Sequence, residues 1–506
     1  MTLAEMARIC AASHMMAPPL AATEPRSFQI DSRAVEPGDL FLAIPGERVD
    51  GHQYVGEALQ RGAVAALVMH HRLPLPFLPF APPEGTDAGD GADAGIDPGK
   101  LLFVEQTVCA LQQLATRVLA AWGRPVVGIT GSAGKTTIKE LTAHLLEGLG
   151  RVLKSPGNLN TGYGLPLAVS RMICAGQRPE QFDLAVLEMG MSGYGEIARL
   201  TDLARPQIGV VANVGTAHLE FFGSIERIAR AKAEMVEGIV PGGIAVLNAD
   251  DPRTLAMGQL RSDLRVMTFG IEAETAEVRA TDLVMQSDLR GTSFLLCTPT
   301  GKSPVHFPLL GRHNVSNALA AATVGVALGM STEQIADRLS SALPAANRGE
   351  VLSFPFVAKG ESGQVTVVDD SYNANPPALL EAVRAITERQ PSGPVRRILV
   401  AGEMLELGPE GPRLHRSCGR EIAAAGIDLL IGVRGLAAEL IEGAIEEGGM
   451  ARDLTRFFEN AADAADWLLG ELQPGDLILV KGSRGVRLES LVRRLAAALA
   501  PPDEPA

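Results

Sequence analysis

The stretch Gly128-Ile129-Thr130-Gly131-Ser132-Ala133-Gly134-Lys135-Thr136-Thr137 lies between an apolar run at 125–129 and an amphipathic run at 138–149. This order predicts a strand, a glycine-rich turn and a helix. In such a turn, backbone N–H groups close around phosphate oxygens, and the helix N-terminus favours their negative charge. We therefore expect residues 131–137 to bind the phosphates of ATP or GTP, with Lys135 at the outer phosphates and Thr136 ligating Mg²⁺.

The turn departs from the strict P-loop pattern at one position. That pattern places a glycine five residues before Gly134, where this chain has Ile129, and its extra glycines fall at Gly128 and Gly131. The spacing is typical of a particular subgroup of P-loop proteins. The alternative is an ordinary strand-to-helix loop, which the ordered succession of strand, loop and helix disfavours.

Size and composition restrict the class of protein. The chain has 506 residues, too many for one core, and about 150 residues per domain predicts three domains. Its formal net charge of −14 argues against a nucleic acid partner held by phosphate neutralisation. Residues 1–16 lack the unbroken apolar core of a signal peptide, and no run is long enough for a membrane span. We expect a cytoplasmic monomer.

The cysteines carry no metal-binding or redox pattern. There are five, they are far apart, and none forms a CxxC or Cys/His spacing. We interpret all of them as reduced residues that pack in the interior: Cys10, Cys109, Cys174, Cys297 and Cys418.

The apolar pattern predicts an α/β fold with three domains. Residues 1–122 form a smaller α/β domain, in which the Gly-, Ala-, Asp- and Pro-rich stretch 73–100 is a disordered insertion. Residues 123–345 form a central P-loop domain with a mainly parallel sheet, a β segment at 277–307 and a helical hairpin at 314–343. Residues 346–506 form a Rossmann-like domain with a loose tail at 501–506. The strands predicted for the last two domains are 126–129, 184–188, 208–212, 244–248, 266–269, 365–368, 398–401, 429–433, 457–458 and 477–480.

Two polar residues follow neighbouring strands of the central domain. Glu188 ends one predicted strand and His218 follows another, and ligands bind at the carboxyl ends of strands in open α/β sheets. Glu188 could hold Mg²⁺ directly or through water, and His218 could bind metal or phosphate. The alternatives are a solvated carboxylate and a structural histidine. Lys232 lies in a helix rich in charges and alanines, and its spacing alone favours an exposed lysine paired with a glutamate.

The third domain carries two polar strand-end segments. Residues 369–376 read Asp-Asp-Ser-Tyr-Asn-Ala-Asn-Pro, which is more polar than a turn requires and indicates a loop that contacts a ligand. The turn Gly482-Ser483-Arg484 suits an anionic group such as a phosphate or a peptide carboxylate, because arginine presents a fork of donors to such oxygens.

Taken together and in order, these motifs resemble the Mur ligase family over nearly the whole chain, and within it the members that add D-alanyl-D-alanine. The loop of this family has the form Thr-Gly-x-x-Gly-Lys-Thr, so the departure at Ile129 belongs to the resemblance. The matching segments are 31–33, 38–41, 50–52, 130–137, 157–160, 188–190, 217–220, 231–234, 311–314, 369–376, 402–404, 406–408 and 481–484. The Asp-Asn-Pro-Arg motif of the relatives that add diaminopimelate or lysine is absent from the third domain.

The resemblance implies one substrate for each domain and a role for particular residues. Ser32 and Arg33 would hold the UDP end of UDP-N-acetylmuramoyl-tripeptide. Asn158, Asn160 and Thr161 would face its peptide. Asn314, Arg348 and Asp370 would complete the ATP site. Lys232 would be carbamylated and would ligate a second Mg²⁺ with His218, which reverses the interpretation from spacing. The residues expected to contact D-alanyl-D-alanine are Asn373, Asn375, Ser483 and Arg484.

The implied reaction is ATP-dependent amide ligation through an acyl phosphate, in peptidoglycan precursor synthesis. Carboxylate is a poor electrophile, so ATP must first activate it. Two alternatives remain open on the sequence: a related Mur or folylpolyglutamate-type ligase that adds a single amino acid, and a nucleotide-switched binding protein that performs no ligation.

Overall fold

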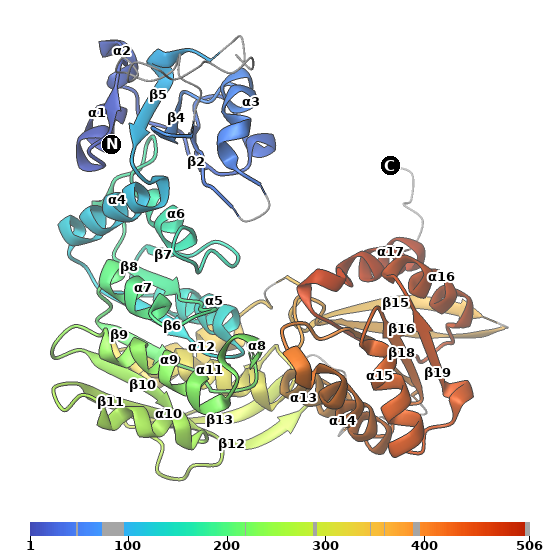
Figure 1. The fold of residues 1–506 in the computed structure, drawn as a ribbon. Helices are drawn as coiled ribbons and strands as arrows, with labels where there is room; N and C mark the ends of the chain where they lie inside the picture. Colours follow the sequence, from blue (N-terminus) through green and yellow to red (C-terminus); the bar gives the residue numbers. More distant parts are fainter. Residues whose placement is uncertain are drawn as a thin grey trace, which may run out of the picture.

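The computed structural model describes residues 1–46, 49–72, 96–217, 219–286, 291–344, 346–358, 360–387 and 395–500. The predictions for His218, for 73–95 of the insertion and for the tail at 501–506 lie outside these residues. Within them the chain forms three mostly parallel sheets with helices on their faces, which confirms the α/β fold class. Each sheet takes its strands from one continuous stretch of sequence, coloured from blue to red in Figure 1.

The first sheet has five short strands in the order β1-β5-β4-β3-β2, and only β1 runs antiparallel to its neighbour. Residues 96–100, predicted to be disordered, are ordered: Ile96 packs on the core around Phe41, and Pro98–Lys100 form a 3₁₀ turn before β5. Their neighbour in sequence is a buried strand, which fixes their position. The strands are β1 (Ser13–His14), β2 (Phe28–Gln29), β3 (Leu40–Leu42), β4 (Ala65–Met69) and β5 (Leu101–Val104).

The central sheet has nine strands in the order β14-β13-β12-β11-β10-β9-β6-β8-β7, antiparallel only among β12, β13 and β14. The glycine-rich turn follows β6, which lies between β8 and β9. The strands are β6 (Val126–Thr130), β7 (Val152–Lys154), β8 (Leu184–Glu188), β9 (Ile208–Val211), β10 (Ile244–Asn248), β11 (Arg265–Gly270), β12 (Val278–Met285), β13 (Thr292–Thr298) and β14 (Gly301–Phe307).

The C-terminal sheet has six strands in the order β15-β16-β20-β17-β18-β19, with β15 antiparallel to β16. The sequence did not predict β15, because its alternating exposed and half-buried residues lack a strong apolar run. The strands are β15 (Glu350–Ala358), β16 (Glu361–Asp369), β17 (Arg397–Gly402), β18 (Leu429–Val433), β19 (Thr455–Phe458) and β20 (Leu477–Lys481).

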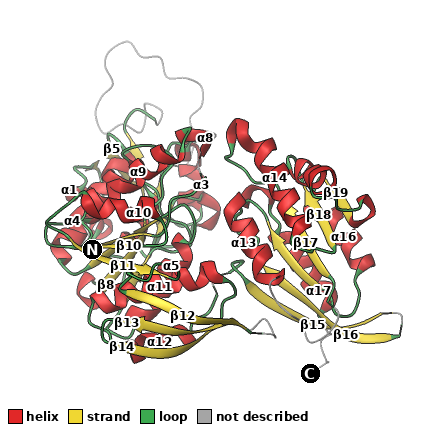
Figure 2. Ribbon diagram, turned by 90° about the horizontal axis from the view of Figure 1, so that it is seen from below, coloured by secondary structure: helices red, strands yellow, loops and turns green. Residues whose placement is uncertain are grey.

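Helices cover both faces of the two larger sheets, as Figures 1 and 2 show. The first stretch carries α1 (Leu3–Ile9), α2 (Pro18–Ala21), α3 (Val55–Gln60) and α4 (Thr107–Trp122). The central stretch carries α5 (Lys135–Leu146), α6 (Gly164–Ser170), α7 (Glu196–Ala204), α8 (Leu219–Phe222), α9 (Ile225–Glu237), α10 (Pro252–Ala256), α11 (Arg312–Ala327) and α12 (Thr332–Ser340). The last stretch carries α13 (Pro376–Thr387), α14 (Gly411–Ala424), α15 (Ala437–Glu442), α16 (Ala461–Glu471) and α17 (Glu489–Leu499).

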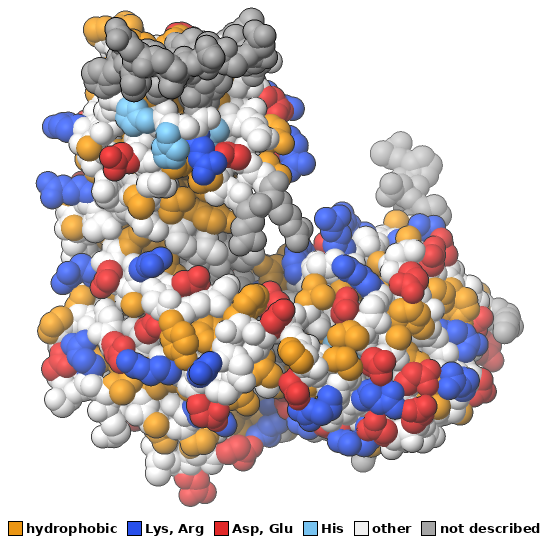
Figure 3. Space-filling view, viewed as in Figure 1, with side chains coloured by type: hydrophobic (Ala, Val, Ile, Leu, Met, Phe, Trp, Pro, Cys, Tyr) orange, Lys and Arg blue, Asp and Glu red, His pale blue; other side chains and the backbone are white. Residues whose placement is uncertain are grey.

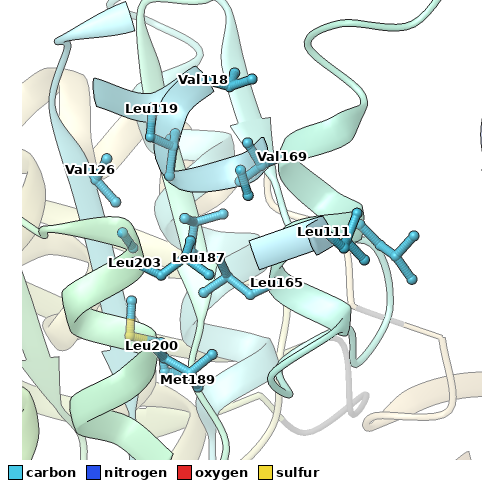
Figure 4. Packing of buried hydrophobic residues seen from close by; sticks show 14 of the residues in the cluster. Leu111, Val118, Leu119, Val126, Leu165, Val169, Leu187, Met189, Leu200 and Leu203 are labelled. Atoms are coloured by element: carbon cyan, nitrogen blue, oxygen red, sulfur yellow. The ribbon is translucent and has the colours of Figure 1, made fainter. Parts of the chain in front are cut away.

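The strands next to the glycine-rich turn are apolar on both faces because both faces are covered. Val126 points into a core shared with α4, α6 and α7, whereas Val127 points into a core shared with α5, α11 and α12. Figure 4 shows the first of these cores, where Leu119 of α4 points toward Leu187 of β8. Thus α4 packs on the central sheet.

The three sheets lie in separate parts of the molecule (Figure 1). In Figure 1 the first sheet lies at one end of the central part, and the C-terminal part lies to one side of the central part. Contacts between α11 and α13, and between α8 and the 3₁₀ turn Gly408–Glu410, join the central and C-terminal parts. The space-filling view shows the surface hollowed between the first and the C-terminal parts (Figure 3).

Two further observations concern the cysteines and membranes. Cys10, Cys174 and Cys418 are buried as expected, but Cys109 is exposed on α4, so its interpretation as an interior residue is wrong. It follows the buried Thr107 by two positions in a helix, which turns it away from the core. Among the described residues, no helix is both long and apolar enough to cross a membrane.

Candidate functional site

A cavity of about 570 Å³ lies where the central and C-terminal sheets meet. The glycine-rich turn forms one wall, the loop after β7 with α4 and α7 forms a second, and strand ends of the C-terminal sheet form a third. The predicted site residues that line it are Ser132, Ala133, Gly134, Lys135, Thr136, Thr137, Asn158, Asn160, Thr161, Glu188, Asn314, Arg348, Asp370, Asn373, Asn375 and Arg484. Tertiary structure therefore brings together residues that lie far apart in the sequence.

The glycine-rich turn is closely packed. Gly134 has a left-handed φ of +81°, and a Cβ there would collide with the amide of Asn317 on α11, so only glycine fits. Helix α5 begins at Lys135, whose Nζ donates to the carbonyl oxygen of Gly131 at 2.8 Å. Removal from water lowers the pKa of Lys135, and nearby Glu188 partly opposes this effect. The turn thus presents a helix N-terminus and a cation to the cavity.

Asn213, which the sequence did not single out, holds the turn from behind. Its Oδ1 accepts the backbone N–H of Ser132 at 3.1 Å and of Ala133 at 2.9 Å, and its Nδ2 donates to the carbonyl of Ala133 at 3.1 Å. One side chain therefore fixes the backbone of two residues in the turn. Its position two residues after β9, at the carboxyl end of a neighbouring strand, was the available signal.

Glu188 connects the turn to the loop after β7. It is 2% exposed, its Oε2 accepts from the Thr136 hydroxyl at 2.9 Å, and its Oε1 accepts from Nδ2 of Asn160 at 2.8 Å. The buried carboxylate is thus held in one orientation by groups from both walls. This contradicts the alternative of a solvated loop carboxylate.

The start of α11 forms the floor near Gly134. Asn314 is 6% exposed, donates to the carbonyl of Leu310 at 2.9 Å and accepts from Asn317 at 3.3 Å. His313 also lines the cavity, although the sequence analysis gave it no role. Its Nδ1 is enclosed and has no hydrogen-bond partner among the described residues, and burial lowers its pKa. It therefore offers an uncharged, unpaired polar atom.

The C-terminal wall reaches across to the turn. Arg348 donates to the Thr136 hydroxyl at 3.1 Å, and its guanidinium stacks on Tyr372 with 3.9 Å to the ring centroid. Asp370 forms an ion pair of 2.6 Å with Lys481 of β20, and Lys481 also donates to the carbonyl of Asn373 at 3.1 Å. Lys481 was not predicted as a site residue, and Tyr372 was predicted only as a member of the ligand-contacting loop 369–376; the fold brings the ends of β16 and β20 together.

The predicted dipeptide contacts divide into two groups. Asn373, Asn375 and Arg484 line the cavity, and the Asn375 side chain also accepts the N–H of Ala378 at the start of α13. Ser483 does not line it, and its predicted contact with a ligand stays a prediction. It is 3% exposed, and its hydroxyl accepts the N–H of Leu405 at 2.9 Å and donates to the carbonyl of Ala374 at 3.3 Å. Ser483 therefore tethers two loops behind the cavity wall.

Ser32 and Arg33 lie in the first part of the chain and do not line this cavity. Ser32 is buried and donates to Glu57 at 2.9 Å. Arg33 is exposed and forms two hydrogen bonds with Asp31, at 2.9 and 2.7 Å. The structure places them at a separate surface, on the same stretch as the first sheet, so their predicted contact with the UDP end stays a prediction.

Lys232 is buried, which contradicts the interpretation from spacing. It lies in α9 with 1% exposure, and none of the described carboxylates forms an ion pair with it. Burial, together with the charge of Lys135, lowers its pKa well below the usual value. The available signal was the apolar stripe of α9: Ile228 lies four residues before Lys232, and Met235 and Val236 lie three and four residues after it, so all four share the buried face.

The donor groups suit a magnesium ion shared with phosphates. The Thr136 hydroxyl and the Glu188 carboxylate supply two possible oxygen ligands for the metal, 2.9 Å apart, next to the glycine-rich turn. Mg²⁺ is held in such sites by one or two protein oxygens together with phosphates and water. A cluster of three or more His, Cys, Asp or Glu side chains suited to a metal does not occur among the residues that the structure describes.

Family models match this chain in three places: the Mur ligase middle domain at 129–325, the Mur ligase glutamate ligase domain at 356–484 and the Mur ligase catalytic domain at 26–73. The UDP-N-acetylmuramoyl-tripeptide--D-alanyl-D-alanine ligase of Mycobacterium tuberculosis H37Rv is 36% identical over 93% of this chain and 92% of its own length. The ligase of the same name from Escherichia coli K12 is also 36% identical, over 92% of each.

Solved structures agree with these matches. MurF from Acinetobacter baumannii superposes with a TM-score of 0.79 at 29% identity, covering 98% of both chains. MurF from Thermotoga maritima in complex with ADP superposes with a TM-score of 0.73 at 28% identity, covering 96% of this chain and 99% of that one. Sequence and fold therefore show that this chain belongs to the Mur ligase family.

Proposed function

We propose that this chain is an ATP-dependent ligase that joins D-alanyl-D-alanine to UDP-N-acetylmuramoyl-tripeptide, with release of ADP and phosphate, in peptidoglycan precursor synthesis. The observation that carries the proposal is the shared cavity, where a phosphate-binding turn, the loop after β7 and the C-terminal strand ends face one another. The names of the relatives supply the two substrates. The ADP complex of the Thermotoga maritima relative supports ATP as the third.

Each domain would contribute one substrate. Residues 1–122 would bind the UDP-sugar, 123–345 would bind ATP, and 346–506 would bind the dipeptide. Within them, Ser32 and Arg33 would hold the UDP end, and the loop after β7 would face the peptide. Asn314, Arg348 and Asp370 would complete the nucleotide site. Because the reaction consumes ATP and a UDP-linked precursor, we place the protein in the cytoplasm. We further propose that it acts as a monomer.

The first step activates the acceptor. An oxygen of the tripeptide carboxylate bonds to the γ-phosphorus of ATP, and the bond from that phosphorus to the bridging oxygen of ADP breaks. Two anions must approach for this to happen. Lys135 and Arg348 place positive charge at that point, and Lys135 can leave the Gly131 carbonyl for a phosphate oxygen. Mg²⁺ held by Thr136 and Glu188 would neutralise further phosphate charge when bound.

The second step forms the amide bond. The amine nitrogen of D-alanyl-D-alanine bonds to the acyl carbon, phosphate leaves with the former carboxylate oxygen, and the amine releases a proton. Asn373, Asn375 and Arg484 would orient the dipeptide from the C-terminal wall. Enclosure between the walls would keep water from the acyl phosphate.

Lys232 and His218 would form a second metal site. The burial of Lys232 favours its uncharged amine, which is the form that can add CO₂ to give a carbamate. A carbamate would convert the buried lysine into an oxygen ligand for a second Mg²⁺, alongside His218. Intact mass measurement in bicarbonate, under native conditions, would detect the added CO₂.

A product assay tests the main proposal. The protein is given ATP, Mg²⁺, the UDP-linked tripeptide and, in parallel, D-alanyl-D-alanine, L-lysine, meso-diaminopimelate or glutamate, and the products are identified by mass. We expect an adduct with the dipeptide only, and phosphate release that requires both the tripeptide and the dipeptide. A single-amino-acid adduct would indicate a different ligase, and substrate-independent ATP hydrolysis without an adduct would indicate a nucleotide switch.

A further inference from the structure

Lys139 is a buried cation beside the cavity that the proposed mechanism does not use. It lies in α5, one helical turn after Lys135, and it is 0% exposed. An ammonium ion is costly to bury unless partners replace its water. The groups that contact the Lys139 ammonium therefore show which segment of the protein it stabilises.

Two of the partners of Lys139 belong to one turn of the backbone. Its Nζ donates to the carbonyl oxygens of Ser155 and Gly157, both at 2.7 Å, and forms an ion pair of 3.0 Å with Glu140. Gly157 adopts a left-handed φ of +52°. This turn comes directly before Asn158, so the ammonium group fastens the start of the loop after β7 to the helix that follows the nucleotide-binding turn.

The same loop reaches the cavity and Glu188. The Ser155 hydroxyl accepts the N–H of Glu188 at 3.2 Å, and Asn160 donates to the Glu188 carboxylate at 2.8 Å. Asn158 and Thr161 line the cavity. Lys139 thus connects α5 to the residues proposed to contact the tripeptide. The nucleotide-binding turn has its own support in Asn213, which does not involve Lys139.

We propose that Lys139 is a positioning residue that sets the loop 155–161 for the tripeptide substrate, without contributing to nucleotide binding. This inference rests on the proposed function. Without the ammonium group, the carbonyls of Ser155 and Gly157 lose their partner and the loop leaves its position. The loss then falls on the affinity for the tripeptide and spares the affinity for ADP.

Calorimetric titration of full-length Lys139→Met tests the inference, with ADP and UDP-N-acetylmuramoyl-tripeptide as separate ligands. The tripeptide carries L-lysine or meso-diaminopimelate, whichever the wild-type protein uses faster. We expect the Kd for the tripeptide to rise about tenfold or more, since buried carbonyls lose a charged donor. The Kd for ADP should change less than about twofold. In turnover, KM for the tripeptide should rise while KM for ATP does not.

Lys154→Met is the matched control. Lys154 pairs with the same Glu140 at 2.5 Å but is 43% exposed, and neither carbonyl of the turn contacts it. We expect this variant to keep both Kd values. Equal effects of the two substitutions, or an equal loss of ADP and tripeptide affinity in Lys139→Met, would overturn the inference.

A second variant covers the case in which Lys139→Met does not fold. Gly157 is exposed, and a Cβ there would meet nothing within 4 Å, so Gly157→Ala disturbs only the backbone conformation that directs its carbonyl. We expect the same selective rise in the Kd for the tripeptide, and an unchanged Kd would refute the role of the turn. Wild-type protein that binds ADP but no tripeptide would overturn the proposed function and this inference with it. Unchanged tripeptide binding by both variants overturns only the role of Lys139.

Discussion

The central and C-terminal sheets each present a strand end to the cavity. The charged side chains at these two strand ends differ in their partners. After β6, the ammonium of Lys135 donates to a backbone carbonyl and leaves most of its charge available to a ligand. After β16, the charge of Asp370 is matched at 2.6 Å by Lys481 from the neighbouring strand. One strand end is cationic, and the other is neutral overall with both signs present.

This difference corresponds to the two ligands that we propose. A nucleoside triphosphate carries several negative charges, so its site gains from the cation Lys135 and from a helix N-terminus. A dipeptide with free termini carries one charge of each sign. Its proposed contact Asn373 is held by Lys481 through the Asn373 carbonyl, and the same Lys481 pairs with Asp370, which we propose for the nucleotide site. Two similar strand-loop-helix units thus carry their lysine at different places: Lys135 is the first residue of the helix after β6, whereas Lys481 lies on the strand next to β16.

The largest effect is expected from Lys135→Ala, which removes the cation from the nucleotide side. We expect kcat to fall by about 10²–10³, the usual loss when a group that stabilises developing charge is deleted. Phosphate release in the presence of tripeptide and dipeptide measures it. Lys302→Ala, an exposed position on β14, serves as the control. Full activity in Lys135→Ala would refute the role of the turn and the first half of the comparison.

A smaller effect is expected from Lys481→Met, which leaves Asp370 without its counter-ion on the C-terminal side. We expect a cost of about 2 kcal/mol, seen as a roughly thirtyfold rise in KM for D-alanyl-D-alanine, because Lys481 also holds the carbonyl of Asn373, a proposed dipeptide contact. Steady-state kinetics at saturating ATP measure it. The double variant Lys481→Met/Asp370→Asn should recover part of the loss, because it leaves no lone charge. A rise in KM for ATP alone would show that the pair serves the nucleotide.

The smallest effect concerns pH. On the C-terminal side, buried His415 accepts the N–H of Met404 at 2.9 Å through Nε2 and donates to the Gly411 carbonyl at 2.7 Å through Nδ1. In the central part, the side chain that supports a loop in a comparable way is that of Asn213, which does not titrate. Burial lowers the pKa of His415 below 6.5, so folding favours the neutral ring. The resulting stability is present above pH 6.5 and is lost as the pH falls through the lowered pKa.

Urea unfolding between about pH 5 and 8 measures this contribution. His415→Gln should remove a dependence of up to about 1.4 kcal/mol per pH unit below pH 6.5, so its stability curve should be flatter than that of the wild type. His52 also has a lowered pKa and stays in both proteins, so the difference between the curves reports His415 alone. Identical curves would show that His415 titrates equally in the folded and unfolded chains.

Local sequence patterns predicted the structure correctly where a residue type has a single structural role. The strand predicted at 184–188 matches β8, and that at 429–433 matches β18, because runs of buried aliphatic residues with polar borders form central strands of parallel sheets. The glycine-rich turn was predictable for a similar reason, since only glycine fits at Gly134. Glu188 was found by its place at the end of a strand.

Long-range contacts were beyond the sequence. Ser483 was predicted to contact a ligand as part of the turn at 482–484, and the sequence did not show that its hydroxyl also bonds to Leu405 and Ala374. Asn213 and Lys139 look ordinary in the chain, and each gains its role from backbone groups that the fold brings alongside. The burial of Lys232 likewise depends on how α9 packs on the sheet.

The sequence alone determined the α/β class, the position of the glycine-rich turn and the family, since these depend on periodicity, on glycine and on residues adjacent in the chain. Only the tertiary structure decided which side chains share the cavity and which support it from behind. The physical reason is that a buried polar group must find its partner wherever folding places one. For Lys139, Asn213 and Ser483 that partner is backbone from a separate segment, and backbone atoms leave no mark in the sequence.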